Sequence, residues 1–271
     1  MAQRHVAVGD VTLDTVELGA GPPLLFLHGE DGLMHCRPLL DDLASSYRVI
    51  APHHPAWGES TRPAHIGETR DLGLVYAELV ESLEAPPLVL GCSFGGWVAA
   101  ELGVLTRAPL AAIVLAAPTG VKIGGREDRD FADIWIAAFD DLPGILYGDP
   151  ARSPVLVDRP DEDYLYLAKA QEATARYCWK PYMHDPTLAP WLRRIAAPTL
   201  VVAGSEDRFA LLEGYYGRYA TLIGERGAEL RTIEGAGHRV EEDAPAELAA
   251  IVREFDSERA AAAVGASSGD Q

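Results

Sequence analysis

The hydrophobic positions of this chain form two kinds of run. Near the N-terminus, residues 5–8 and 11–18 alternate apolar and polar positions on either side of Gly9-Asp10, a pattern typical of a tight β-hairpin. Further along, continuous apolar runs are typical of strands buried on both faces. These runs cover residues 24–27, 47–52, 88–90, 110–116, 198–204 and 229–233. We therefore expect an antiparallel start followed by a series of buried strands.

Helical patterns separate most of these runs. Apolar residues recur at helical spacing in residues 39–43, 72–83, 97–105, 188–195, 211–223 and 245–255. Strands that alternate with helices are joined by right-handed crossovers and form a parallel sheet. The pattern thus predicts the α/β class, with a mostly parallel sheet flanked by helices.

The alternation is interrupted between residues 119 and 187, where no strand run is found and Pro, Gly and charged residues separate two helical patterns. Residues 164–175 form the second pattern. The first consists of Phe131, Trp135, Ala138 and Leu142, which share one helical face. This segment is expected to be a helical insertion.

The interruption divides the chain into parts. We expect a core domain made of residues 1–118 and 188–258, a helical cap insertion at 119–187, and a disordered tail at 259–271. The tail prediction depends on a composition rich in Ala, Ser and Gly. A chain of 271 residues with a hydrophobic fraction of 48% can bury one sizeable core.

The charge of the chain limits its partners. Lys and Arg total 23 against 41 Asp and Glu, which gives a formal net charge of -18, and no basic tract interrupts the acidity. Nucleic acid and anionic membrane surfaces are therefore not expected as partners. A small-molecule substrate fits better, and a homo-oligomer is compatible with the sequence.

The cysteines point to a reducing compartment. Cys36, Cys92 and Cys178 are widely spaced, with no C-x-x-C pair and no zinc-type Cys/His cluster. Residues 1–5 lack an apolar signal core, and no apolar run has the length needed to cross a bilayer. We expect a cytoplasmic protein that needs neither a metal nor a cofactor.

The strongest chemical motif is Gly91-Cys92-Ser93-Phe94-Gly95. It lies between a buried strand and a helix, and a turn this tight requires glycines on both sides of a strained central residue. Ser93 would then protrude at the edge of the sheet as a nucleophile. The alternative is a glycine-rich turn used only for close packing. Cys92, beside the serine, is expected to be a small buried residue and not a second nucleophile.

A serine nucleophile needs a base and an acid. His238 follows a predicted strand on a Gly-rich loop and is the candidate base, and Asp207 follows another predicted strand and is the candidate acid. Strand ends of an open α/β sheet share one edge, where ligands bind. Alternatives are Glu206, Asp128 or Asp130 as the acid. If these residues have no catalytic role, Asp207 is expected to be a helix N-cap and His238 a surface turn residue.

The loop His28-Gly29-Glu30 follows the first buried strand. The backbone N–H of Glu30, together with that of Phe94, is the candidate oxyanion hole, and this role does not require the Glu30 side chain. We expect His28 to support the loop through a hydrogen bond. Aromatic residues of the insertion could line a substrate pocket or only pack the helices. Trp135, Phe139 and Trp179 are the candidates for substrate binding.

Taken together, these residues resemble the α/β-hydrolase superfamily. Ser93, Asp207 and His238 follow that family's order, and His28-Gly29 and Gly58-Glu59-Ser60 resemble two of its loop motifs. The resemblance covers residues 6 to about 255. It implies the α/β-hydrolase fold, with an eight-stranded sheet and a cap at the insertion.

Three positions bear on the subgroup. Residues 52–55 read Pro-His-His-Pro, where the family usually carries an Asp, and Arg239 stands where the superfamily's C–C bond hydrolases tend to have Trp. Ser93 replaces the carboxylate that haloalkane dehalogenases and epoxide hydrolases use as nucleophile. The sequence therefore favours a serine hydrolase that cleaves an ester, or a similarly activated acyl bond, of a small and mostly apolar molecule. The alternatives are a C–C bond hydrolase, a lyase, a cofactor-free oxygenase or a ligand receptor.

Overall fold

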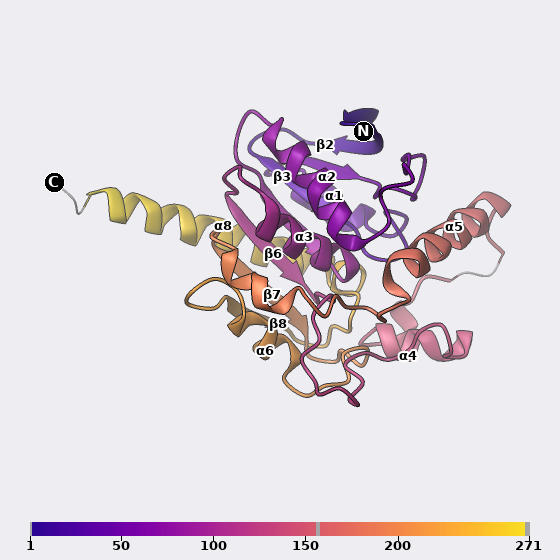
Figure 1. The fold of residues 1–271 in the computed structure, drawn as a ribbon. Helices are drawn as coiled ribbons and strands as arrows, with labels where there is room; N and C mark the ends of the chain where they lie inside the picture. The colour runs from indigo at the N-terminus through magenta and orange to yellow at the C-terminus, as the bar shows by residue number, and fades with distance from the viewer. Residues whose placement is uncertain (1, 156–157, 269–271) are drawn as a thin grey trace.

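The computed structural model describes residues 2–155 and 158–268 and contains one eight-stranded sheet, with the strand order β1-β2-β4-β3-β5-β6-β7-β8 (Figure 1). β2 pairs antiparallel with β1 and β4, and the other neighbouring strands pair in parallel. The strands are β1 (Ala2–Val8), β2 (Val11–Leu18), β3 (Pro23–Leu27), β4 (Arg48–Pro52), β5 (Leu88–Cys92), β6 (Ala112–Ala116), β7 (Thr199–Gly204) and β8 (Glu229–Ile233). The expected α/β class with a mostly parallel sheet is confirmed.

Helices flank this sheet. α2 packs on α3, and α1 packs on α7 and α8. The α-helices are α1 (Arg37–Leu43), α2 (Thr69–Glu81), α3 (Phe94–Leu105), α4 (Leu142–Leu146), α5 (Asp161–Cys178), α6 (Tyr215–Thr221), α7 (Val240–Asp243) and α8 (Pro245–Ser268), and the 3-10 helices are η1 (Phe139–Asp141), η2 (Pro150–Arg152) and η3 (Ala189–Arg194). The helix expected over residues 188–195 is thus 3-10, and that expected over 211–223 begins only at Tyr215.

The parallel strands end at one edge of the sheet. Every residue of β5, β6 and β7 is buried, as their continuous apolar runs predict. In the β5–β6 pair Cys92 lies beside Ala116, and in the β7–β8 pair Gly204 lies beside Ile233. The loops that follow these strands therefore start at similar heights, and their side chains can meet.

The segment between β6 and β7 carries α4 and α5, which lie beside the body of the molecule in Figure 1. Helix α5 confirms the second helical pattern. The helix expected over residues 131–142 is wrong, because tertiary bonds replace its helical ones. Ala132 donates its N–H to the Phe209 carbonyl, and the Tyr182 hydroxyl bonds to the backbone of Ala132 and Ile134. Only the short η1 and α4 form there.

The C-terminal segment also differs from the expectation. We expected the last helix to end near residue 255 and residues 259–271 to be disordered, but α8 continues to Ser268. Alanine has the highest helix propensity, so the Ala-rich stretch after Arg259 prolongs the helix even where it extends away from the body (Figure 1). The rest of the tail prediction, residues 269–271, lies outside the described residues. Over the described ranges, no helix is both long and apolar enough to cross a membrane.

Candidate active site

Ser93 occupies the turn between β5 and α3 in a strained conformation, with φ 49° and ψ -113°. The glycines around it permit this turn. A Cβ on Gly91 would collide with the carbonyl oxygen of Gly95, and a Cβ on Gly95 would collide with that of Leu27 at the end of β3. The turn therefore holds Ser93 close to the loop that follows β3, as the motif predicts.

Three side chains from separate strand ends meet at this turn. Ser93 Oγ lies 2.7 Å from His238 Nε2, and His238 Nδ1 lies 2.9 Å from Asp207 Oδ2. Ser93 and His238 are each 1% exposed. The structure thus brings together the serine, imidazole and carboxylate that the sequence pattern predicts at one edge of the sheet.

Asp207 accepts hydrogen bonds at both of its oxygens. Oδ1 accepts from the backbone N–H groups of Phe209 and Ala210, so the capping interaction considered as an alternative is present as well. Oδ2 accepts from His238 and, at 2.5 Å, from the Tyr216 hydroxyl. Burial works to raise the pKa of Asp207, but these partners outweigh it and hold the pKa below its usual value. Asp207 is therefore an ionised partner for the histidine.

The electrostatics of His238 favour its protonated form. Burial acts to lower its pKa, but the Asp207 carboxylate, with Glu30 and Glu241 nearby, raises it above the usual value. This is the environment of a base that must hold a proton for part of a reaction cycle.

The Glu30 side chain lies in the site, which the sequence did not indicate. Its Oε1 is 2.7 Å from Ser93 Oγ, and the side chain is almost completely buried. In the described part of the chain, the N–H of Glu30 has no hydrogen-bond acceptor. The N–H of Phe94 opens helix α3, where no intrahelical acceptor exists. Both predicted oxyanion donors are thus available, and the carboxyl group is an additional feature.

Hydrogen bonds fix the loop that carries Glu30. Its carbonyl oxygen accepts from Trp57 Nε1 at 2.9 Å and from the Thr174 hydroxyl of α5 at 3.1 Å. His28 supports the loop as expected: Nδ1 donates to the Gly29 carbonyl, and Nε2 accepts from the backbone N–H of His54. The loop carrying His54, where the family usually has an Asp, is therefore part of the support for the oxyanion loop.

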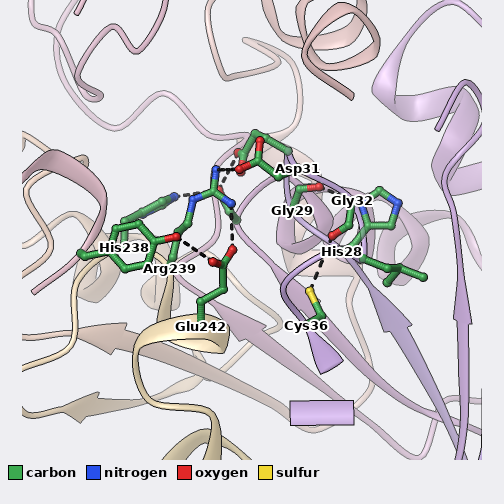
Figure 2. A network of polar contacts seen from close by, with 12 residues as sticks. His28, Gly29, Asp31, Gly32, Cys36, His238, Arg239 and Glu242 are labelled. Atoms are coloured by element: carbon green, nitrogen blue, oxygen red, sulfur yellow. Dashed lines mark hydrogen bonds and ion pairs between the residues drawn. The ribbon is translucent and has the colours of Figure 1, made fainter. Parts of the chain in front are cut away.

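An ion-pair cluster around the buried Arg239 lies beside the site. The Arg239 guanidinium lies between Asp31 and Glu242, at 2.8 and 3.1 Å (Figure 2). Tyr147, which follows α4, donates its hydroxyl to Glu242 at 2.6 Å. The cluster joins the loop after β3, helix α7 and the insertion, and Arg239 lies at its centre.

A cavity of about 380 Å³ lies between the insertion and the core. Trp135 and Phe139 line it, together with Glu30 and Arg239. Trp179 does not, contrary to the expectation that it binds substrate. It is 57% exposed at the end of α5, and its ring packs against the edge of Trp135. The apolar wall thus comes from the insertion and the polar wall from the core loops.

The other candidate groups do not assemble into a site. Cys36, Cys92 and Cys178 are buried and unpaired, and burial raises the pKa of each thiol. Among the residues that the structure describes, no group of three or more His, Cys, Asp or Glu side chains is arranged to hold a metal ion. Glu206 pairs with Arg208, and Asp130 pairs with Lys122. Neither of these acids contacts His238.

Comparison with known proteins gives a consistent result. A model of the alpha/beta hydrolase family matches residues 24–251. The chain is 26% identical to 2-hydroxymuconate semialdehyde hydrolase from Pseudomonas sp. (strain CF600), covering 96% of both chains. It is 25% identical to 2-hydroxy-6-oxo-6-(2'-aminophenyl)hexa-2,4-dienoic acid hydrolase from Metapseudomonas resinovorans, covering 96% of this chain and 94% of the other.

A solved structure shares the same fold. A variant of the meta-cleavage product hydrolase from Pseudomonas fluorescens IP01 superposes with a TM-score of 0.74 at 19% identity, over 94% of this chain and 97% of the other. Identity at this level supports the fold alone.

Proposed function

Because the chain belongs to the alpha/beta hydrolase family, we propose that it is a serine hydrolase that cleaves an ester, or a similarly activated acyl bond, of a small and mostly apolar molecule. The observation that carries this proposal is the hydrogen-bonded series of Ser93, His238 and Asp207, with distances of 2.7 and 2.9 Å. A hydroxyl in contact with a buried histidine is the arrangement that acyl transfer to serine requires.

Each residue has a defined role in this mechanism. Ser93 Oγ attacks the carbonyl carbon while His238 Nε2 takes the hydroxyl proton, and Asp207 stabilises the resulting imidazolium. The N–H groups of Phe94 and Glu30 donate to the oxyanion. His238 then protonates the leaving group, and water attacks the acyl-enzyme by the same route in reverse.

The cavity limits the substrate. A volume of about 380 Å³ accommodates a small molecule, and apolar residues of the insertion form much of its wall. The Asp31–Arg239–Glu242 cluster places one cation between two acids, so among the described lining residues no arginine or lysine is left without an acidic partner to bind an anionic substrate. The unpaired buried cysteines support a reducing compartment, the cytoplasm, as the place of action.

Replacement of the nucleophile tests the proposal. In Ser93→Ala, hydrolysis of a chromogenic short-chain ester is expected to fall by a factor on the order of 10³ or more, and labelling by a fluorophosphonate probe should disappear. Ser46→Ala, at an exposed serine, serves as the matched control and should label normally. An unchanged melting temperature would show that the fold persists. Labelling of Ser93→Ala at the rate of the unmodified protein would exclude the proposed nucleophile.

A second candidate function is cleavage of a C–C bond. The two relatives above favour it, because one is a hydrolase of 2-hydroxymuconate semialdehyde and the other of a 2-hydroxy-6-oxo-hexa-2,4-dienoic acid, and neither of these compounds is an ester. In this reaction His238, assisted by Asp207, abstracts and transfers protons, while Ser93 positions the substrate or the attacking water. Turnover of 2-hydroxymuconate semialdehyde with little esterase activity would select this function. A burst of product release from the chromogenic ester would select the first.

A further inference from the structure

Two acids line the cavity, Glu30 and Asp31, and only Asp31 has an ionic partner there, Arg239 at 2.8 Å. The Glu30 side chain is 5% exposed and accepts a hydrogen bond from the Ser93 hydroxyl, with Oγ 2.7 Å from Oε1. Within the described ranges, no donor contacts the second oxygen, Oε2. Glu30 therefore gives the cavity a buried carboxyl group with unused capacity to accept hydrogen bonds.

The hydrogen bond from Ser93 to Glu30 cannot last through the reaction. The hydroxyl carries one hydrogen, and Oγ lies 2.7 Å from both Glu30 Oε1 and His238 Nε2. When Oγ attacks a carbonyl carbon, this hydrogen passes to Nε2. Oε1 then loses its donor while it remains buried, and a buried acceptor without a donor is costly. A carboxyl oxygen accepts hydrogen bonds with or without a proton on the group, so the loss arises in both forms.

The protein groups around Glu30 do not replace this donor. The Trp57 indole and the Thr174 hydroxyl both donate to the backbone carbonyl of Glu30, at 2.9 and 3.1 Å. The Arg239 guanidinium is held by the ion pairs described above. The cavity, in contrast, reaches Glu30 but neither Ser93 nor His238. A substrate that enters from the cavity thus meets the Glu30 carboxyl first and can supply the missing donor.

We propose that Glu30 is a specificity-determining residue that selects substrates whose acyl group carries a hydroxyl close to the scissile carbonyl. This inference rests on the serine hydrolase function proposed above. The substrate hydroxyl donates to the Glu30 carboxyl when Ser93 releases its hydrogen to His238. A hydroxyl suits this cavity better than an ammonium group, because the apolar wall does not compensate for the desolvation of a charge.

The geometry limits where the substrate hydroxyl is placed. Oε1 is 2.7 Å from Oγ, so a donor within hydrogen-bond reach of Oε1 lies within about 6 Å of Oγ. The carbonyl carbon becomes bonded to Oγ during attack. The hydroxyl therefore belongs two or three bonds from that carbon, on the α or β carbon of the acyl group. The apolar remainder of the molecule can pack on Trp135 and Phe139.

The test compares two esters of the same size, 4-nitrophenyl 3-hydroxybutanoate and 4-nitrophenyl 3-methylbutanoate, in which a hydroxyl replaces a methyl group. Each kcat/KM is divided by the rate of uncatalysed hydrolysis of that ester, which corrects for intrinsic reactivity. The unmodified enzyme should prefer one enantiomer of the hydroxy ester by about tenfold or more, because the methyl ester leaves the buried acceptor without a donor.

Replacement of Glu30 should change this preference. Glu30→Met and Glu30→Ala remove the acceptor and should bring the two esters to within about twofold of each other. Glu30→Gln keeps an acceptor oxygen at the same reach and should retain part of the preference. Because the measured quantity is a ratio, a loss of activity common to both esters cancels. Melting temperatures and fluorophosphonate labelling show whether each variant is folded with a reactive Ser93.

Gln171→Leu is the matched control. Gln171 is another polar residue that lines the cavity, but its side chain is exposed, so its replacement should leave the ratio unchanged. The proposal is wrong if the unmodified enzyme shows no preference, if Glu30→Met and Glu30→Ala keep it, or if Gln171→Leu abolishes it. Turnover of both esters by Ser93→Ala at the rate of the unmodified enzyme would instead defeat the underlying serine mechanism.

Discussion

The Tyr216 hydroxyl shares Asp207 Oδ2 with the His238 ring, at 2.5 and 2.9 Å. It also lies 3.3 Å from His238 Nδ1. Sharing the oxygen weakens the pull of Asp207 on the imidazolium, because part of the carboxylate charge is neutralised by the phenol. At the scale of single residues, Tyr216 thus adjusts the base without touching the nucleophile. The sequence does not indicate this role of Tyr216, because the residue lies within an ordinary helical pattern.

Tyr216→Phe tests this adjustment. Without the phenol, Asp207 acts on His238 alone and should raise the pKa of the imidazole further. The acidic limb of kcat/KM should then move to higher pH, by less than about one pH unit, and activity near pH 6 should fall. The matched control is Tyr219→Phe on the same helix, whose hydroxyl has no partner among the described residues. An acidic limb that stays in place, or moves to lower pH, would contradict this role.

Helix α3 follows the nucleophile and carries an unusual buried acid. Both carboxyl oxygens of Glu101 lack a hydrogen-bond partner within the described ranges, and Arg70 is 4.0 Å away. Burial raises the pKa of Glu101 from 4.5 to about 7, so the folded state favours the protonated form. Below about pH 4.5 the Glu101 carboxyl is neutral in both the folded and the unfolded state, so it does not lower the free energy of unfolding. As the pH rises to 7 the unfolded chain ionises first, so the free energy of unfolding falls, and above pH 7 the loss is complete.

Glu101→Gln in helix α3 should remove this loss in the free energy of unfolding. The variant is expected to be more stable than the unmodified protein at pH 8, by at most about 3 kcal/mol, and to differ little at pH 4.5. Urea unfolding at both pH values measures the difference. Glu81→Gln on the neighbouring α2 should show no such pH dependence, since that side chain is exposed. The explanation would be wrong if the gain in stability of Glu101→Gln over the unmodified protein were smaller at pH 8 than at pH 4.5.

The cavity belongs to the whole molecule, because the insertion supplies its apolar wall and the core its reactive edge. The two parts are joined by side chains of α5 that bond to core loops. Tyr166 accepts from the Leu33 N–H at 2.9 Å, and Tyr177 donates to the Pro55 carbonyl at 3.1 Å. These bonds help to hold the insertion against the core loops.

Trp135 and Trp179 provide a matched pair for the cavity. Trp135→Ala removes apolar wall and should raise KM for a short-chain ester by about tenfold with little change in kcat, as expected for lost uniform binding. Trp179→Ala removes a ring that packs outside the cavity and should change KM less. Equal effects of the two replacements on KM would show that the wall is not formed as described.

The sequence by itself determined the sheet and the meeting of Ser93, His238 and Asp207. Strand periodicity and the alternation with helices specify a parallel sheet, and a parallel sheet brings the loops after its strands to one edge. The turn at Ser93 is a local steric matter, settled by the glycines that flank it. Such features depend on neighbouring residues and on a period of the pattern, so they can be derived before any tertiary contact is known.

The tertiary structure alone decided where the side chains of the loops point. The Glu30 carboxyl, the Tyr216 hydroxyl and the Trp179 ring are placed by segments far away in the chain, through contacts that no local pattern specifies. Residues 131–138 do not form the expected helix for the same reason, since Phe209 and Tyr182 provide hydrogen bonds to their backbone. The tail is the reverse case: its alanines favour a helix locally, and a composition-based prediction of disorder ignored that propensity.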